Sequence, residues 1–203
     1  MKKIISFALV MAMMLTLAAC GNKGSEAPEA TPEATPVATP EATPEVTPEA
    51  TPETSGVSVK DIADKVAAAY GDDFAATMEL DEVTIKEVIG VDPAWAEEIY
   101  AAQPMISANC DKLIIVKAKS ENLEDVKKAV NAYRDTLVAD LMQYPMNQLK
   151  IQASQVDVYG NYVIYTCLGF IPMEVEEKGD DAILEAYKAE NQKAVAVYDE
   201  LLK

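Results

Sequence analysis

The three cysteines carry the most distinctive chemistry in this sequence, because the chain contains no histidine. Without histidine, the usual general base near neutral pH, the commonest metal ligand and any Ser–His or Cys–His pair are missing. Cys20 ends an apolar run near the N-terminus, whereas Cys110 and Cys167 lie far downstream. We therefore expect no metal site and no cofactor, and we interpret the two groups of thiols separately.

Cys20 follows a segment that is typical of an export signal. Two lysines precede the mainly apolar run 4–17, which is shorter than the roughly 20 residues that a transmembrane helix needs. The sequence Leu17-Ala18-Ala19-Cys20 resembles the lipobox of bacterial lipoproteins. That resemblance implies removal of a signal peptide, residues 1–19, and a thioether between Cys20 and a diacylglycerol. Two acyl chains would hold the protein durably on a membrane.

The predicted location follows from this anchor. We expect the chain on the outer face of the cytoplasmic membrane, at the extracellular side of the cell envelope, with the lipid on Cys20 as its membrane contact. The alternative is an ordinary secretory signal that a cysteine follows by chance. We favour the lipoprotein interpretation, because the site lacks the Ala-x-Ala pattern of ordinary signals.

Residues 20–56 have the composition of a linker. Proline recurs at every fourth position from Pro28 to Pro52, and Glu, Ala and Thr fill most of the places between. Proline removes the amide donor, and the remaining residues bury too little apolar surface to fold. We expect an extended spacer of about 3.1 Å per residue. The Thr-Pro repeats are alternatively acceptors for O-glycans, and a third interpretation is a low-complexity linker whose length is not selected.

Residues 57–203 have a common size for one folded domain. The whole chain carries a formal net charge of −17 and shows no basic stripe. A nucleic acid would be repelled by such a chain, so we exclude nucleic-acid partners.

The apolar patterns of the domain predict an α+β fold. Helical spacing predicts a first helix from Ser58 to Gly71, then helices over 81–90, 94–100, 123–144 and 146–153, and a last helix capped by Asp180 or Asp181. Alternating patterns predict two hairpins, 104–108 with 113–119 and 155–159 with 162–170. The expected result is a small antiparallel sheet from two β-hairpins separated by a long helix, with flanking N- and C-terminal helices.

The order of these elements resembles a known family. Leu113-Ile114-Ile115-Val116-Lys117 leads into a helix bearing Val126 and Arg134, followed by Tyr144-Pro145 and a hairpin around Gly160-Asn161-Tyr162-Val163. Over residues 57–171 this is similar to domain of unknown function 4358, which is found in lipoproteins of Gram-positive bacteria. The resemblance implies a small exported α+β domain and carries over no catalytic residue.

The sheet face opposite the predicted core is our candidate binding surface. It should present five side chains, Tyr159, Tyr162, Ile164, Lys117 and Lys119. Tyrosines stack on sugar rings or anchor a protein partner. The alternatives are that the two tyrosines form a cross-strand pair that only stabilises the hairpin, or that a helix covers this face.

Two further groups of residues have both a chemical and a structural interpretation. Cys110 and Cys167 form an even pair suited to a disulfide, but we favour two separate buried thiols, because one lies at a predicted turn and the other inside a strand. The acidic pairs at 72–73 and 180–181 would suit calcium or acid–base chemistry. We favour a role at helix ends, and we interpret Glu174, Glu176 and Glu177 as a solvated loop.

Two functions remain open from the sequence. The first is a non-catalytic binding module for an envelope protein, a peptide or a glycan. The alternative is a hydrolase that acts on the cell wall with paired carboxylates. A deep cleft with two converging buried carboxylates would favour the hydrolase, and a shallow surface lined by tyrosines would favour the binding module.

Overall fold

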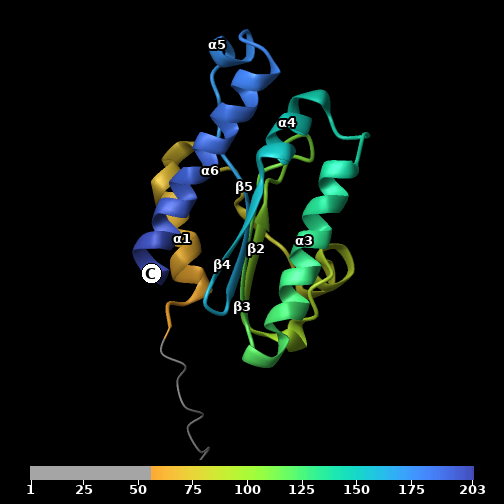
Figure 1. Ribbon diagram of the computed structural model, residues 1–203, viewed down its shortest axis with the longest axis vertical. Coiled ribbons are helices and arrows are strands. Elements are labelled where there is room, and N and C mark those ends of the chain that lie inside the picture. Colours follow the sequence, from red (N-terminus) through yellow and green to blue (C-terminus); the bar gives the residue numbers. More distant parts are fainter. Residues whose placement is uncertain (1–55) are drawn as a thin grey trace, which may run out of the picture. The chain divides into compact units, whose positions relative to one another are not determined.

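The computed structural model describes residues 56–203, which form an α+β domain (Figure 1). The predicted signal peptide, Cys20 and nearly all of the predicted linker lie outside the described residues. The predicted α+β class is confirmed. Within residues 56–203, no helix has both the length and the apolar character needed to cross a membrane.

The centre of the domain is one antiparallel sheet in the order β1-β2-β3-β5-β4. Its strands are β1 (Met78–Glu79), β2 (Ala96–Gln103), β3 (Lys112–Ala118), β4 (Gln155–Tyr159) and β5 (Tyr162–Cys167). The hairpins β2–β3 and β4–β5 join through antiparallel pairing of β3 with β5. The predicted register of the second hairpin is confirmed, since Tyr159 pairs with Tyr162 and Val156 pairs with Tyr165.

Helices cover both faces of the sheet, as Figure 1 shows. One face packs against α1 (Val59–Tyr70) and α6 (Asp180–Leu202), around Ile115 and Ile164. The other packs against α3 (Leu123–Ala139) and η2 (Ile85–Ile89), around Ile114 and Tyr165. The remaining helical elements are short: η1 (Gly71–Asp73), α2 (Glu82–Thr84), η3 (Pro93–Trp95), η4 (Ser120–Asn122), α4 (Pro145–Ala153) and α5 (Met173–Glu176).

Several predicted helix ends are confirmed by their caps. The Ser58 hydroxyl accepts a hydrogen bond from the Asp61 amide at 3.1 Å, and α1 gives way to a separate turn at Gly71. Asp81 accepts from the Thr84 amide at 2.7 Å, and the helical segment ends at Gly90, whose φ is 83°. These are standard ways to satisfy the free amides and carbonyls at helix ends.

Three boundary predictions are wrong, and all three concern segments without a decisive local signal. Residues 96–103 form strand β2 and not a helix, because pairing with β3 places alternate side chains in the two cores. Residues 104–108 are consequently a loop and not a strand. Helix α3 ends at Ala139, where Asp140 becomes extended, instead of continuing to Tyr144.

The predicted caps of the last helix are also wrong. Gly179 occupies the N-cap position, and no side chain caps this end. Asp180 and Asp181 lie inside the first turn, where their charges favour the helix dipole without capping an amide.

Candidate functional site

The five residues of the predicted binding face do not form an exposed surface. Ile164 is fully buried, and Lys117 and Tyr162 are 4% and 6% exposed. The face that carries them is covered by α1 and α6. The expectation of an open recognition face is therefore wrong, because the chain provides helices for both sides of the sheet.

These side chains hold the start of α1 onto the sheet instead. The Tyr162 hydroxyl donates to the Val57 carbonyl at 2.6 Å, and Glu98 accepts from the Val59 amide at 3.1 Å. The Lys117 ammonium lies 3.3 Å from Glu97 and 3.7 Å from Glu98. A Cβ at Gly56 would come within 2.7 Å of the Tyr162 hydroxyl, so a larger residue there would have to displace this hydroxyl.

The two outer residues of the set also make internal contacts. The Tyr159 hydroxyl donates to Asp199 on α6 at 2.7 Å, and the Lys119 ammonium donates to the Ala94 carbonyl at 2.8 Å. All the polar groups of the predicted surface thus have partners within the domain.

A cleft at the other end of β3 and β5 is the best candidate site. We call it the terminal cleft, and its volume is about 690 Å³. It lies between η1, the β2–β3 loop, the first turns of α4 and the chain that follows β5, and α5 and α6 each contribute one residue to its lining. Its lining includes Met105, Ile106, Asp111, Met146, Lys150 and Phe170.

A buried ion pair between Lys150 and Asp111 lies beside this cleft. The Lys150 ammonium also donates to the Gly169 carbonyl at 2.5 Å and lies 5.3 Å from the centre of the Tyr187 ring. Burial raises the pKa of Asp111, and the Lys150 charge opposes that rise. Every group in this cluster has a partner, so the ion pair fixes α4, the β2–β3 loop and the end of β5 together.

Gly169 allows this arrangement through its backbone. Its φ is +105°, and a Cβ there would lie 2.5 Å from the Cβ of Glu190 on α6. Only glycine satisfies both requirements without strain. The Gly169 carbonyl can therefore turn toward Lys150 while the chain passes close to α6.

The rim of the cleft is apolar and highly exposed. Four large side chains that line it, Met105, Ile106, Met146 and Phe170, are between 65% and 80% exposed. Such grouping of exposed apolar residues around a concavity is typical of a binding surface. Three carboxylates, those of Asp72, Asp73 and Glu176, also line the cleft. The terminal cleft therefore combines apolar contact area with negative charge.

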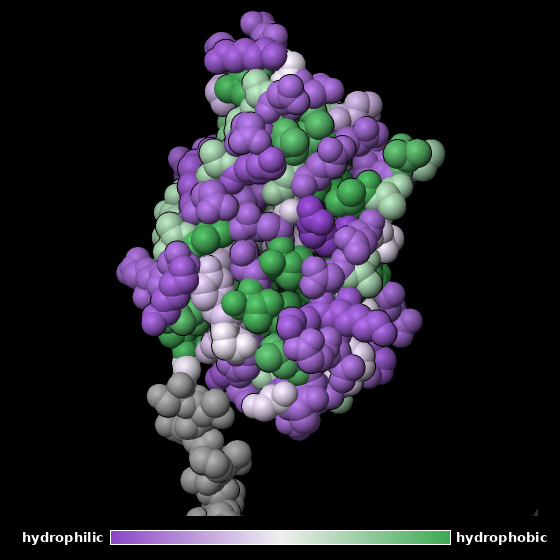
Figure 2. All heavy atoms as spheres, in the orientation of Figure 1, coloured by the Kyte–Doolittle hydropathy of each residue, from purple (hydrophilic) through white to green (hydrophobic). Residues whose placement is uncertain are grey.

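The apolar surface continues beyond the cleft. Leu141, Met142 and Tyr144, in and beside the α3–α4 connection, are also exposed. In Figure 2 this connection projects from the domain as hydrophobic surface surrounded by hydrophilic side chains.

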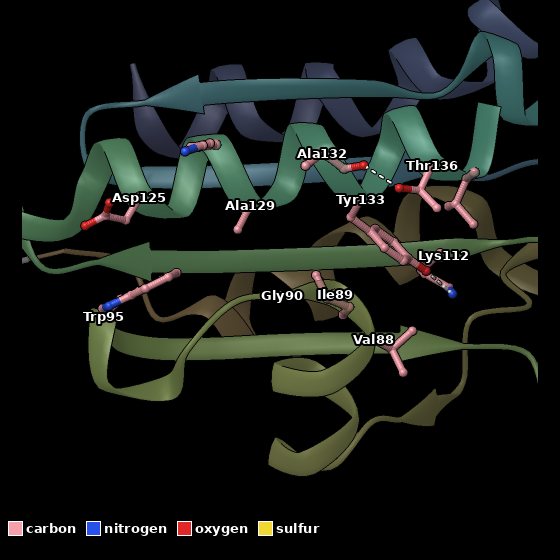
Figure 3. A pocket seen from close by; sticks show the side chains of 12 residues that line it. Val88, Ile89, Gly90, Trp95, Lys112, Asp125, Ala129, Ala132, Tyr133 and Thr136 are labelled. Atoms are coloured by element: carbon pink, nitrogen blue, oxygen red, sulfur yellow. Dashed lines mark hydrogen bonds between the residues drawn. The ribbon is translucent and has the colours of Figure 1, made fainter. Parts of the chain in front are cut away.

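A second concavity, the α3 groove, lies between α3 and η2 and has a volume of about 720 Å³ (Figure 3). Trp95 lies at one end, and Tyr133 lies at the other, where its hydroxyl accepts a hydrogen bond from Lys112 at 2.6 Å. The groove is bordered by exposed Asp125 and Lys128 and contains no buried charge. We favour the terminal cleft, because it alone of the two joins exposed apolar side chains to a buried ionisable pair.

The predicted acidic pairs do not converge. Asp72 and Asp73 line the terminal cleft from η1, whereas Asp180 and Asp181 open α6. Among residues 56–203, no three His, Cys, Asp or Glu side chains are grouped so as to hold a metal ion. Cys110 and Cys167 are both free thiols, the first half-buried and the second buried.

The residues of the terminal cleft were not predicted from the sequence. Nothing in the spacing connects Asp111 with Lys150, since they meet only when α4 packs against the β2–β3 loop. A usable signal did exist in Pro104-Met105-Ile106, an apolar run without a strand pattern, which we assigned to a strand.

The domain matches a known family over part of its length. Residues 70–168 match the model of a family described as Domain of unknown function (DUF4358). The predicted resemblance of the domain is confirmed over this range, which extends from the end of α1 to the residue after β5. No curated protein and no solved structure matches the chain. The match leaves α5 and α6 outside, although both flank the terminal cleft.

Proposed function

We propose that this chain is a membrane-anchored extracytoplasmic lipoprotein whose domain binds a peptide or protein segment in the terminal cleft, without catalysis. The anchor rests on the sequence Leu17-Ala18-Ala19-Cys20 and on the apolar run before it. The Pro-rich segment then serves as the spacer between membrane and domain.

The observation that carries the binding function is the exposed apolar rim of the terminal cleft. Methionine side chains adapt to different apolar partners, and Phe170 supplies a rigid aromatic contact. The carboxylates of Asp72, Asp73 and Glu176 favour a partner with basic residues beside its apolar ones. A glycan would use stacked aromatic faces and many hydrogen bonds, so the rim suits a peptide better.

The hydrolase alternative has weaker support. A pair of catalytic carboxylates needs one protonated and one ionised group on opposite sides of the substrate. Asp111 is the one buried carboxylate among the described residues, and its carboxylate is held by Lys150. Protonating it would break that ion pair at every turnover.

Two labelled peptides test the binding function. They share one apolar sequence, and one is flanked by lysines and the other by glutamates. We expect fluorescence anisotropy to show that the full-length protein binds the lysine peptide more tightly. The double variant Met105→Ser/Phe170→Ser should weaken this binding at least about tenfold, as expected for central apolar contacts.

Val83→Ser is the matched control, because Val83 on α2 is 70% exposed and does not line the cleft. It should bind like the wild type. Equal binding of both peptides, or equal loss in the control, would count against the cleft. The hydrolase would be favoured if the wild type released product from cell-wall fragments and the double variant did not.

Palmitate labelling in cells tests the anchor separately. We expect label and membrane retention in the wild type and neither in Cys20→Ala. Equal labelling of the two chains would remove the lipoprotein from the proposal and leave the cleft untouched.

A further inference from the structure

The two cysteines of the domain meet beside the terminal cleft although they are far apart in the sequence. Lys112 pairs with Cys167 across β3 and β5, which brings Cys110, two residues earlier, to the same place. Both cysteines belong to the core beneath α3. The Cys167 thiol donates a hydrogen bond to the Lys150 carbonyl at 3.8 Å. Their different predicted settings, a turn and a strand, made a disulfide unattractive from the sequence, but the pairing of the strands brings them together.

The two thiols differ in access. Cys110 lines a small cavity of about 210 Å³ with Ser107, Asn109 and Gln143, whereas Cys167 is fully buried. The neighbouring Cys167 thiol lowers the pKa of Cys110, and the charge of Lys150 lowers it further. The neighbouring Cys110 thiol and burial raise the pKa of Cys167. Such an asymmetric pair, one more accessible and more acidic thiol and one buried partner, suits thiol–disulfide exchange.

We propose that Cys110 and Cys167 form a reversible disulfide by exchange with an external low-molecular-weight disulfide. The Cys110 thiolate attacks one sulfur of that disulfide and releases one thiolate. The Cys167 thiol then loses its proton and attacks the Cys110 sulfur of the mixed disulfide, which releases the second thiolate. In total, two protein thiols are oxidised, the external disulfide is reduced to two thiols, and the two protein protons are transferred to them.

The disulfide would act on the wall of the terminal cleft. Cys110 lies between Asn109 and Asp111, which both line the cleft, and Cys167 lies on a central strand. Oxidation would thus attach the β2–β3 loop covalently to β5. This inference stands on the position of the thiols and does not depend on the proposed binding function.

The test uses the full-length chain with Cys20→Ala, in which Cys110 and Cys167 are the only thiols. The protein is equilibrated in mixtures of reduced and oxidised glutathione, quenched in acid and labelled with a maleimide polymer. We expect a shift from two labels to none in a monomer, and a melting temperature higher by on the order of 10 °C in the oxidised form. Two labels at every ratio, or a disulfide between two chains, would overturn the proposal.

Cys110→Ser in the same background is the control that keeps a small polar side chain at a half-buried position. Its melting temperature should not change with the glutathione ratio, and an unchanged redox response would contradict the pairing. Brief treatment of the reduced protein with iodoacetamide, followed by peptide mapping, tests the order of attack. Cys110 should be modified at least about tenfold faster than Cys167; equal rates or faster labelling of Cys167 would overturn the exchange mechanism.

Discussion

Two lysines are buried at opposite ends of β3 and β5, and they do different things there. Lys117 is 4% exposed and pairs with Glu97 and Glu98, which remain partly open to water. Lys150 is 6% exposed and pairs with Asp111, which is itself buried. Around Lys117 the chain covers the sheet, whereas around Lys150 the terminal cleft remains open.

This contrast indicates that the groups that stabilise the domain lie apart from the surface that we propose for binding. At the Lys117 end, polar groups hold the start of α1 in place, and the rings and charges that we predicted for recognition make contacts within the domain. At the Lys150 end, the ion pair anchors the cleft from within, so that apolar side chains can remain exposed on its rim. Exposed apolar area of this kind lowers solubility, and the proposed binding function would account for it.

The largest effect should follow from Lys150→Ala. This change leaves the Asp111 carboxylate buried without its partner, which typically costs about 3–5 kcal/mol. Urea unfolding of the full-length protein measures the loss. The double variant Lys150→Met/Asp111→Leu should recover most of it, because apolar residues can replace a buried pair. If the double variant were as unstable as Lys150→Ala, packing and not charge would determine the stability of the Lys150 end.

Lys117→Ala should cost less, about 1–2 kcal/mol, although Lys117 is just as buried. Its partner carboxylates are 29% and 38% exposed and regain water when the ammonium is removed. The same urea titration gives the comparison. A loss equal to that of Lys150→Ala would refute the distinction between the two ends.

The sequence predicted correctly those parts of the fold that local residues determine, namely helix ends and one hairpin register. Ser58, Asp81 and Gly90 mark helix ends by their own chemistry, and Gly160-Asn161 sets the register of the second hairpin. The family resemblance followed from the same ordered pattern.

The predictions that were wrong concern elements whose structure depends on contacts between residues distant in the sequence. Residues 96–103 form a strand only because they pair with β3. The second face of the sheet is covered only because α6 packs beside α1. A hint of the second layer was present in Leu113-Ile114-Ile115-Val116, since a run that is apolar on both faces is typical of a strand buried on both sides. The terminal cleft had no such hint, because its ion pair joins the β2–β3 loop to helix α4, which are far apart in the sequence.

Alkaline pH should weaken the Lys150 end through Tyr187. Burial raises the pKa of Tyr187 to about 12, from an ordinary value of 10.0, and nearby Cys110 and Glu176 add to the rise. Between these two values the unfolded tyrosine loses its proton more readily than the folded one, so stability falls as pH rises. Because the ring borders the open cleft, we expect a contribution of about 1–2 kcal/mol, less than full burial would give.

Unfolding free energies at pH 9 and pH 11.5 measure this contribution. The loss between them should be smaller in Tyr187→Phe than in the wild type. Tyr144→Phe, which alters an exposed tyrosine outside the cleft, is the control and should follow the wild type. Equal losses in all three proteins would mean that Tyr187 titrates alike in the folded and unfolded chain.

Tyr162→Phe should have the smallest effect on stability, about 0.5–1 kcal/mol, because it removes one hydrogen bond and keeps the ring. The effect should be local, since the lost acceptor is the Val57 carbonyl just before α1. Hydrogen exchange of the first turn of α1 should therefore accelerate, while the amides of α4 beside the terminal cleft keep their wild-type rates. Faster exchange in both places would mean that the Lys117 end and the Lys150 end open together. The domain would then unfold locally as one cooperative unit and not as two independent ends.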